Sequence, residues 1–327
     1  MTLTALELCA GAGGQALGLA RAGFKHVALV DNDEHACQSL QRNFPGTRIM
    51  RADIRRLRDP ARFKGIDLLA AGLPCPPFSV AGQQLGADDE RNLFPAMFDI
   101  VRAIRPKAVM IENVPGLMAP KFKTYRLEIC DRFDRLGYHT EMRVLDASDF
   151  GVPQRRQRVF IVALRHRTAD AFRWPEPTEP SPPDVGKALR DLMAANGWRS
   201  ADRWARLAND LAPTIVGGSK KHGGADLGPT RSRAAWAKLG VEGKSLANEA
   251  PPHDFTGMPR LTIPMVARLQ GFPDGWHFAG KKTHAYRQVG NALPPRVALA
   301  VARQIKRAII ETRREQAFAA KHSRIAW

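Results

Sequence analysis

Residues 6–19, LELCAGAGGQALGL, decide the fold class of this chain. A short apolar run ends in a glycine-rich turn, and the residues after the turn have helical spacing. A glycine turn between a strand and a helix brings backbone amides close to a ligand. Its A-G-A-G-G spacing differs from the G-x-G-x-x-G of dinucleotide-binding folds, which argues against a nicotinamide cofactor.

The alternation of strand-like and helix-like segments continues to about residue 165. The expected strands after the first are HVALVD (26–31), IDLLAAG (66–72), KAVMIEN (107–113), HTEMRVLDA (139–147) and RVFIVALR (158–165). The expected helices are QALGLARAG (15–23), DEHACQSLQRNF (33–44), LFPAMFDIVRAIRP (93–106) and YRLEICDRFDRLGY (125–138). This order predicts an α/β fold with an open, mostly parallel sheet and helices on both faces.

The pattern changes at the proline-rich segment WPEPTEPSPPD (174–184). Irregular loops rich in glycine and proline follow it, which predicts a second, smaller, loop-rich domain. Residues 293–321 have the pattern of a long amphipathic helix with a basic outer face, and we expect it to pack back on the first domain. The predicted domains are 1–165 plus 281–327 for the larger one and 166–280 for the smaller one.

The composition indicates a polyanionic partner. A net charge of +18 and a pI of about 10.4 favour nucleic acid, although a basic surface common to the host's proteins is an alternative. No apolar run approaches the roughly 20 residues that span a bilayer. The four cysteines (Cys9, Cys37, Cys75, Cys130) have no paired spacing, which favours reduced thiols over disulfides or a metal site. With no secretion signal at the N-terminus, we expect a cytoplasmic protein.

Two acids follow the glycine turn at places where such folds bind a cofactor. Asp31 ends a predicted strand, where an acid can bind a ribose diol. Asp53 ends the next strand-like segment, RIMRADI (48–54). Taken alone, Asp31 could be a helix N-cap and Asp53 a turn acid. Together with the glycines, they predict a cofactor that carries a ribose and an adenine.

Three further stretches carry reactive side chains. In GLPCPPFSVAG (72–82), prolines stiffen the backbone around Cys75, which suits either a rigid turn or a nucleophile on a stiff loop. Glu112 follows an apolar strand and is either a helix N-cap or a buried carboxyl that can donate a proton. Arg156 and Arg158 lie two residues apart on an extended segment, so both can face one side, which suits either an anion or carbonyl site or a solvated basic edge.

Near the C-terminus, QVGNALPP (288–295) reads as a turn at Gly290 and Asn291, followed by a proline pair that opens the last helix. In this order, the stretches resemble the motifs of DNA (cytosine-5) methyltransferases of bacterial restriction–modification type. The resemblance rests on LELCAGAGGQALGL, GLPCPPFS, ENVPG, QRRQRVFIVA, RLTIPMVARLQGFPDGW and QVGNALPP, and it covers about residues 3–165 and 259–305.

The resemblance implies a Rossmann-like methyltransferase sheet, S-adenosylmethionine as cofactor (S-adenosylhomocysteine as product), and a small lobe that recognises the target. Cys75 would add to C6 of a flipped cytosine, and protonated Glu112 would hydrogen-bond N3. Arg158 would contact the O2 side of the base, and Arg156 would support the catalytic loop. Asn113 would hold the Pro-Cys loop. The segment 82–94 would close over the DNA, with Gly82 and Gly86 as pivots.

The resemblance also implies binding residues. The expected cofactor-binding residues are Cys9, Ala10, Gly11, Gly13, Gly14, Asp31, Asn32, Asp53, Ile54, Pro74 and Asn291. Asn32 stands where the family often has a large apolar residue that stacks on adenine. The expected DNA-binding residues are Ser79, Gln83, Lys220, Lys221, His222, Arg231 and Arg233.

The expected partner is double-stranded DNA, with a cognate restriction endonuclease that would act separately. The expected protein is a monomer without membrane contact, held at the bacterial nucleoid through DNA. Two alternatives stay open: a transfer-RNA cytosine-5 methyltransferase of the same fold, and a catalytically inactive DNA-binding relative. An amino-methyltransferase of cytosine or adenine would carry an Asp/Asn-Pro-Pro-aromatic motif, whereas PCPPF has cysteine before its proline pair.

Overall fold

A computed structural model describes residues 2–74, 92–179, 181–218 and 224–323. The strands are β1 (Leu3–Leu8), β2 (Phe24–Asp31), β3 (Ile49–Arg51), β4 (Leu68–Gly72), β5 (Ala108–Asn113), β6 (Tyr138–Asp146) and β7 (Gln157–Arg165). The helices are α1 (Gly14–Arg21), α2 (Glu34–Asn43), α3 (Phe94–Ile104), α4 (Lys123–Arg135), α5 (His166–Ala169), α6 (Val185–Met193), α7 (Ala201–Leu207), α8 (Thr230–Lys238), α9 (Ile263–Leu269), α10 (Lys282–Asn291) and α11 (Pro295–Ser323).

The strands form one seven-stranded sheet in the order β3-β2-β1-β4-β5-β7-β6. The strands β1 to β5 pair in parallel, whereas β7 runs antiparallel to both of its neighbours. Strands β2 and β3 are added on one side of β1, and β4 and β5 are added on the other side. Because these strands are parallel, the carboxyl ends of β1, β2 and β4 meet at one edge, next to the switch in strand order where ligands bind in such sheets. The predicted open, mostly parallel α/β sheet is therefore confirmed.

Helices cover both faces of the sheet. Residues of α3 and α4 pack on one face with Leu6, Leu8 and Ile111, and residues of α1 and α11 pack on the other face with Leu3 and Ala5. The central strands are buried on both sides, which explains why they read as nearly continuous apolar runs.

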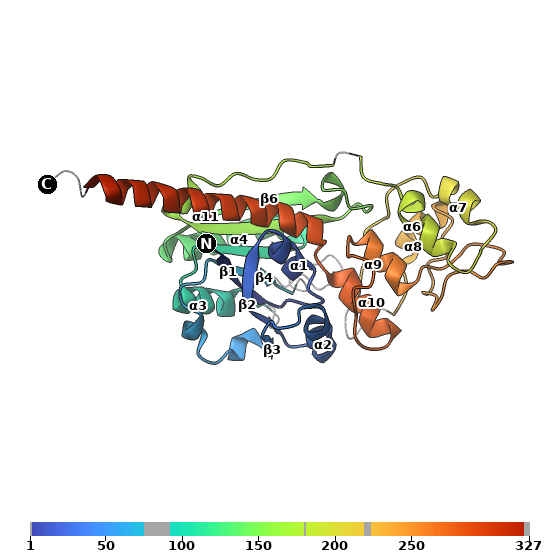
Figure 1. Cartoon of the computed structure of the whole chain (residues 1–327), viewed down its shortest axis with the longest axis horizontal. Coiled ribbons are helices and arrows are strands. Elements are labelled where there is room, and N and C mark those ends of the chain that lie inside the picture. The colour runs from blue at the N-terminus through green and yellow to red at the C-terminus, as the bar shows by residue number, and fades with distance from the viewer. Residues whose placement is uncertain (1, 75–91, 180, 219–223, 324–327) are drawn as a thin grey trace.

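The long helix α11 packs back on the first part of the chain, as the sequence predicts (Figure 1). Its contact with α1 is close because Gly18 has no side chain. A Cβ added there would lie 2.5 Å from Ala298 Cβ and 2.7 Å from the Pro295 carbonyl oxygen. The last helix of the chain thus completes a core layer that the first helix begins.

The helices α6 to α10 lie beside the sheet in a separate lobe (Figure 1). They share an apolar cluster that runs from Val185 to Ala292 and includes the fully buried Trp236. The sequence reading does not predict α6, α7 and α8, which are short and lie between irregular loops. The apolar side chains of α10 pack in this cluster, whereas Phe172 packs with the sheet. The division at residues 165/166 and 280/281 stays a prediction.

Across the part of the chain that the structure describes, no helix combines the length and apolarity that a membrane crossing requires. Cys9, Cys37 and Cys130 are free thiols. Within the same residues, no cluster of histidine, cysteine and acidic side chains could hold a metal ion.

Candidate active site

A cavity of about 260 Å³ lies at the carboxyl ends of β1, β2 and β4. Most of the predicted cofactor-binding residues line it: Cys9, Ala10, Gly11, Gly14, Asp31, Asn32, Asp53, Ile54, Pro74 and Asn291. Gly13 is not part of the lining. It is the left-handed N-cap of α1, with φ of 85°, and a side chain there would meet Phe44 at 2.8 Å.

The glycine turn and Asp31 form one hydrogen-bonded unit. The Gly11 amide donates to Asp31 Oδ2 at 2.8 Å, and the Asp33 amide donates to Asp31 Oδ1 at 2.8 Å. The N-cap of α2 is Asp33, whose side chain accepts from the Ala36 amide, so Asp31 is not the cap. Burial raises the pKa of Asp31, although the two backbone hydrogen bonds oppose that rise.

Asp53 also lines the cavity. It follows β3 by two residues rather than ending it, and its side chain caps a short 3₁₀ turn at Ile54–Arg56. Its carboxylate pairs with Arg55 Nη2 at 2.6 Å, and this hydrogen bond lowers the pKa of Asp53. The turn-acid interpretation thus holds together with a place on the cavity wall. The neighbouring Ile54 supplies a buried apolar surface.

The cavity also contains polar residues that the sequence reading missed. Glu7 and Gln15 line it and are 1% and 4% exposed. Their side-chain oxygen and nitrogen atoms have no hydrogen-bond partner among the described residues. Glu7 Oε2 lies 3.6 Å from His26 Nε2, and burial raises the pKa of Glu7. A glutamate inside an otherwise apolar strand was the available signal, because a buried charge in a strand needs a reason.

The far wall of the cavity comes from distant parts of the chain. The residues missed there are Leu93, His284, Arg287, Gln288, Ala292 and Leu293. Gly290 and Asn291 belong to the last turn of α10, not to the separate turn that the sequence reading expects. Because α10 also packs in the small-lobe cluster, the cavity is enclosed by both lobes.

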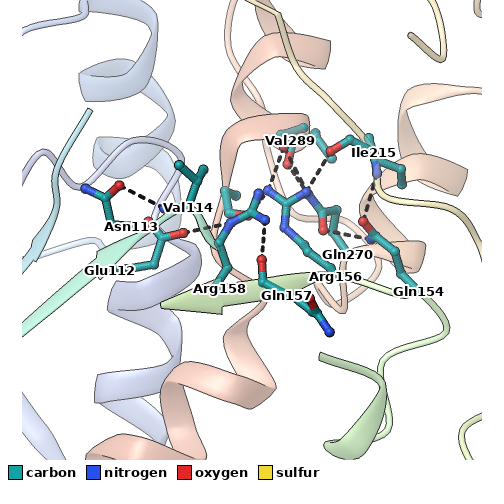
Figure 2. Close-up of polar contacts among 12 residues, drawn as sticks. Glu112, Asn113, Val114, Gln154, Arg156, Gln157, Arg158, Ile215, Gln270 and Val289 are labelled. Atoms are coloured by element: carbon teal, nitrogen blue, oxygen red, sulfur yellow. Dashed lines mark hydrogen bonds and ion pairs between the residues drawn. The ribbon is translucent and has the colours of Figure 1, made fainter. Parts of the chain in front are cut away.

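Glu112 lies at the end of β5 and also lines the cavity. Its Oε1 forms an ion pair with Arg158 Nε at 2.9 Å, and Figure 2 shows the two side chains pointing toward each other. Glu112 is 6% exposed. Burial raises the pKa of Glu112, and the charges of Arg158 and Arg156 oppose that rise. The structure therefore joins one predicted acid and one predicted arginine at the cavity wall.

Arg156 is buried and contacts a different set of groups. Its Nη1 donates to the Ile215 carbonyl at 2.6 Å, and its Nη2 donates to the carbonyls of Gly290 and Ala292 at 2.8 and 3.1 Å. A solvated basic edge is therefore wrong for this residue. Arg156 instead connects the lead-in of β7, which is the stretch just before Gln157, to Ile215 and to the end of α10.

Asn113 is fully buried beside Glu112. Its Oδ1 accepts from the Val114 amide at 2.9 Å, while its Nδ2 has no partner within the described segments. The expected partner of Asn113, the Pro-Cys loop, lies outside the described residues.

Several predicted residues cannot be placed. Those outside the described residues are Cys75, Ser79, Gln83, Lys220, Lys221 and His222, together with most of the segment 82–94. The two remaining predicted DNA contacts, Arg231 and Arg233, lie on α8. Arg231 is exposed, and Arg233 Nη2 lies 3.4 Å from Thr230 Oγ1.

A doubly wound sheet with an antiparallel β7, and a cavity bounded by a glycine turn and acids, define a Rossmann-like methyltransferase. The chain belongs to the C-5 cytosine-specific DNA methylase family, whose family model matches residues 3–307. It is thus a DNA methyltransferase of the cytosine-5 type, as the sequence motifs predict.

Comparisons with known proteins agree with this family. The chain is 52% identical to the Type II methyltransferase M.NaeI of Lentzea aerocolonigenes, covering 94% of this chain and 76% of that protein. It is 49% identical to the Type II methyltransferase M.NgoMIV of Neisseria gonorrhoeae, covering 94% and 99%. A solved prophage-encoded protein of Escherichia coli, assigned as a DNA modification methyltransferase, superposes with a TM-score of 0.67 at 25% identity, covering 94% and 99%.

Proposed function

We propose that this chain methylates C5 of a cytosine within a short duplex DNA site, with S-adenosylmethionine as the methyl donor and Cys75 as the nucleophile. The observation that carries the proposal is the place of Glu112. Its carboxyl group lines the same cavity as Asp31 and the glycine turn, and this carboxyl group is paired with Arg158. A group that can engage a base thus faces the site of a nucleoside-bearing cofactor.

The cavity fits such a cofactor. The Asp31 carboxylate can accept from ribose hydroxyls, and Ile54 offers an apolar surface to an adenine ring. The side-chain atoms of Gln15, which have no hydrogen-bond partner among the described residues, suit the charged methionine end, because buried polar groups need partners. When bound, S-adenosylmethionine supplies an electrophilic methyl group on a sulfonium centre.

The chain's own residues prepare the base. The Cys75 thiolate forms a bond to C6, and electron density shifts to C5 and N3 of the ring. Glu112, protonated, donates a hydrogen bond to N3 and stabilises the charge that develops there. Arg158 is close enough to Glu112 to reach the same ring edge at O2. After methylation the C5 proton passes to a base, for which water suffices, and the Cys75–C6 bond breaks.

The target carbon is inaccessible in stacked DNA, so the cytosine must leave the helix before Cys75 can reach it. The net charge of +18 supports duplex DNA as the substrate, as do the two relatives named Type II methyltransferases. The intact Glu112–Arg158 pair speaks against a catalytically inactive relative.

The test combines transfer and mapping. Purified protein, labelled S-adenosylmethionine and plasmid DNA should give labelled 5-methylcytosine, and bisulfite sequencing should place it in one short sequence. Cys75→Ala should abolish transfer while cofactor binding persists. Undiminished methylation by Cys75→Ala would refute the nucleophile assignment.

A second experiment traps the proposed covalent step. DNA with 5-fluorocytosine at the mapped position should form an adduct that survives denaturant, because fluorine cannot leave as the proton does. The adduct should require Cys75. Its absence from active wild-type protein would argue against covalent catalysis.

The setting is part of the same proposal. We expect a monomer in the bacterial cytoplasm that binds the nucleoid through DNA, with a separate cognate restriction endonuclease. The relatives' designation as Type II methyltransferases supports the endonuclease, and gel filtration tests the oligomeric state.

A further inference from the structure

The segment at residues 215–218 lies directly against the last turn of α10, with no space for a side chain between them. A Cβ on Gly217 would lie 2.6 Å from the Arg287 carbonyl oxygen, and a Cβ on Gly290 would lie 2.5 Å from Gly217 Cα. Asn291 Nδ2 also donates to the Gly218 carbonyl at 3.2 Å. Any shift of this segment must therefore act on the part of α10 that lines the cofactor cavity.

Two buried glutamines, Gln154 and Gln270, connect the segment at residues 215–218 to the last turn of α10 (Figure 2). Gln154 Nε2 donates to Gln270 Oε1 at 2.9 Å, and Gln154 Oε1 accepts from the Ile215 amide at 2.9 Å. Gln270 Nε2 donates to the Val289 carbonyl at 2.7 Å. Both glutamines are 0% exposed, so water cannot replace a lost partner.

The same cluster includes Arg156, whose guanidinium donates to the carbonyls of Ile215, Gly290 and Ala292. Arg156 is two residues from Arg158, which pairs with Glu112. The segment at 215–218, the end of α10 and the lead-in of β7 are thus joined by matched hydrogen bonds in a buried site. Rotation of Gln154 breaks the hydrogen bonds to the Ile215 amide and to Gln270, and rotation of Gln270 breaks those to Gln154 and to the Val289 carbonyl.

We propose that Gln154 and Gln270 are positioning residues that couple occupation of the cofactor cavity to the binding of DNA. The coupling rests on the proposed function. The cavity wall at Asn291 and Ala292 and the segment at 215–218, whose Ile215 packs in the apolar cluster of the small lobe, move as one unit through the glutamine pair. A ligand on one side then favours the arrangement that the other ligand needs, and the effect is reciprocal.

The measurement that tests the coupling is binding, not turnover. The dissociation constant of a duplex carrying the mapped site is measured with and without saturating S-adenosylhomocysteine, and the ratio is the coupling factor. We expect wild-type protein to bind DNA about tenfold more tightly with the cofactor product bound. In Gln154→Leu and Gln270→Leu the factor should fall toward one, while each ligand alone binds with an affinity within about threefold of wild type.

A merely structural role would lower thermal stability without changing the coupling factor. Thr312→Val provides the matched control, because Thr312 is a buried polar residue of α11 whose hydroxyl donates to the Ala308 carbonyl, far from the glutamine pair. This control should lose stability and keep the wild-type factor. Gln154→Glu, which keeps the acceptor for the Ile215 amide but loses the donor to Gln270, should have an intermediate factor.

If the leucine variants fail to fold, Gly217→Ala tests the same contact without removing a buried polar group, and it should also lower the factor. A wild-type factor of one would overturn the inference, as would glutamine and glycine variants that retain the wild-type factor. Failure of the proposed function looks different, because wild-type protein would then transfer no methyl group to DNA.

Discussion

At the residue scale, Glu112 is subject to two opposing influences. Burial raises the pKa of its carboxyl group and favours the protonated form, while Arg158 at 2.9 Å favours the ionised form. The net direction is upward, which suits a group that must donate to N3 of a base. The ion pair also keeps the side chain oriented before DNA arrives.

Glu112→Gln should lower kcat by about a hundredfold, because an amide donates a weaker hydrogen bond to N3 than a protonated carboxyl group and stabilises the developing charge less. Since the pKa of Glu112 is raised, wild-type activity should fall as the pH rises through that value and the carboxyl ionises. The variant should lack this falling limb. The pH profile of kcat/KM is the measurement, with the exposed Glu128→Gln as control; an identical falling limb in Glu112→Gln would assign that limb to another group.

Asp31→Ala should weaken cofactor binding by about 10- to 100-fold, because it removes a charged acceptor and loosens the Gly11 turn. Titration calorimetry with S-adenosylhomocysteine measures the loss. The affinity of the cofactor-free protein for DNA should stay the same. An unchanged affinity for S-adenosylhomocysteine would show that the ribose is bound elsewhere.

At the element scale, the close contact of α1 and α11 decides how the cofactor turn is supported. The α1 helix begins directly after the glycine turn, and α11 begins two residues after Leu293, whose carbonyl oxygen lies 2.2 Å from where a Gly14 Cβ would be. The crossing at Gly18 and Ala298 therefore fixes two walls of the cavity relative to each other.

Gly18→Ala should reduce the free energy of unfolding by about 1–3 kcal/mol, although alanine is the better helix former at an exposed site. The added methyl group has no space against Ala298 and the Pro295 carbonyl. Urea denaturation measures the effect, and adding Ala298→Gly should restore part of the loss. A midpoint equal to that of wild type would mean that α11 moves away without cost.

The elements that the sequence predicts are those whose pattern is local. The strands of the sheet, α1 to α4 and the long α11 carry their periodicity within their own residues, and the strand ends place Asp31 and Glu112 correctly. The helices α7 and α8 are short and gain stability from shared packing around Trp236, so local periodicity does not predict them. The helix α6 does carry a local signal that the sequence reading missed, because Val185, Leu189 and Met193 are spaced along one helical face after an aspartate N-cap.

The cavity is only partly predictable for the same reason. The part of the cavity lining that the glycine turn provides can be predicted from the sequence. The part that α10 provides depends on how the two lobes pack together. The residue type of Arg156 indicates either an anion site or a carbonyl site, and the structure gives it backbone carbonyls as partners. Only the arrangement of distant segments decides such a choice.

At the scale of the whole molecule, the lobes are joined by polar contacts on the cofactor side as well as by the glutamine pair. Asn43 donates to the His277 carbonyl at 2.8 Å and accepts from the His277 amide at 3.1 Å. Trp276 Nε1 donates to the Ala12 carbonyl at 3.0 Å, next to the glycine turn. The small lobe is thus fastened beside the glycine turn and the end of α2 as well as at the glutamine pair.

The net charge of +18 predicts strongly salt-dependent DNA binding. If the protein neutralises six to ten phosphates, affinity should fall by about 10³- to 10⁵-fold between 50 and 200 mM salt. Fluorescence anisotropy with labelled duplex measures the slope, and the affinity for S-adenosylhomocysteine should barely change. A flat response would mean that phosphate contacts contribute little.

The pairing of the first helix with the last has a consequence for synthesis on the ribosome. The α1 surface around Gly18 stays uncovered until α11 emerges, after the entire small lobe has been translated. Nascent chains grow at about 5–20 residues per second, so that apolar surface is exposed for many seconds and is a natural place for a chaperone to act. A polypeptide that ends before α11 would leave the face of the sheet beside α1 without its covering helix.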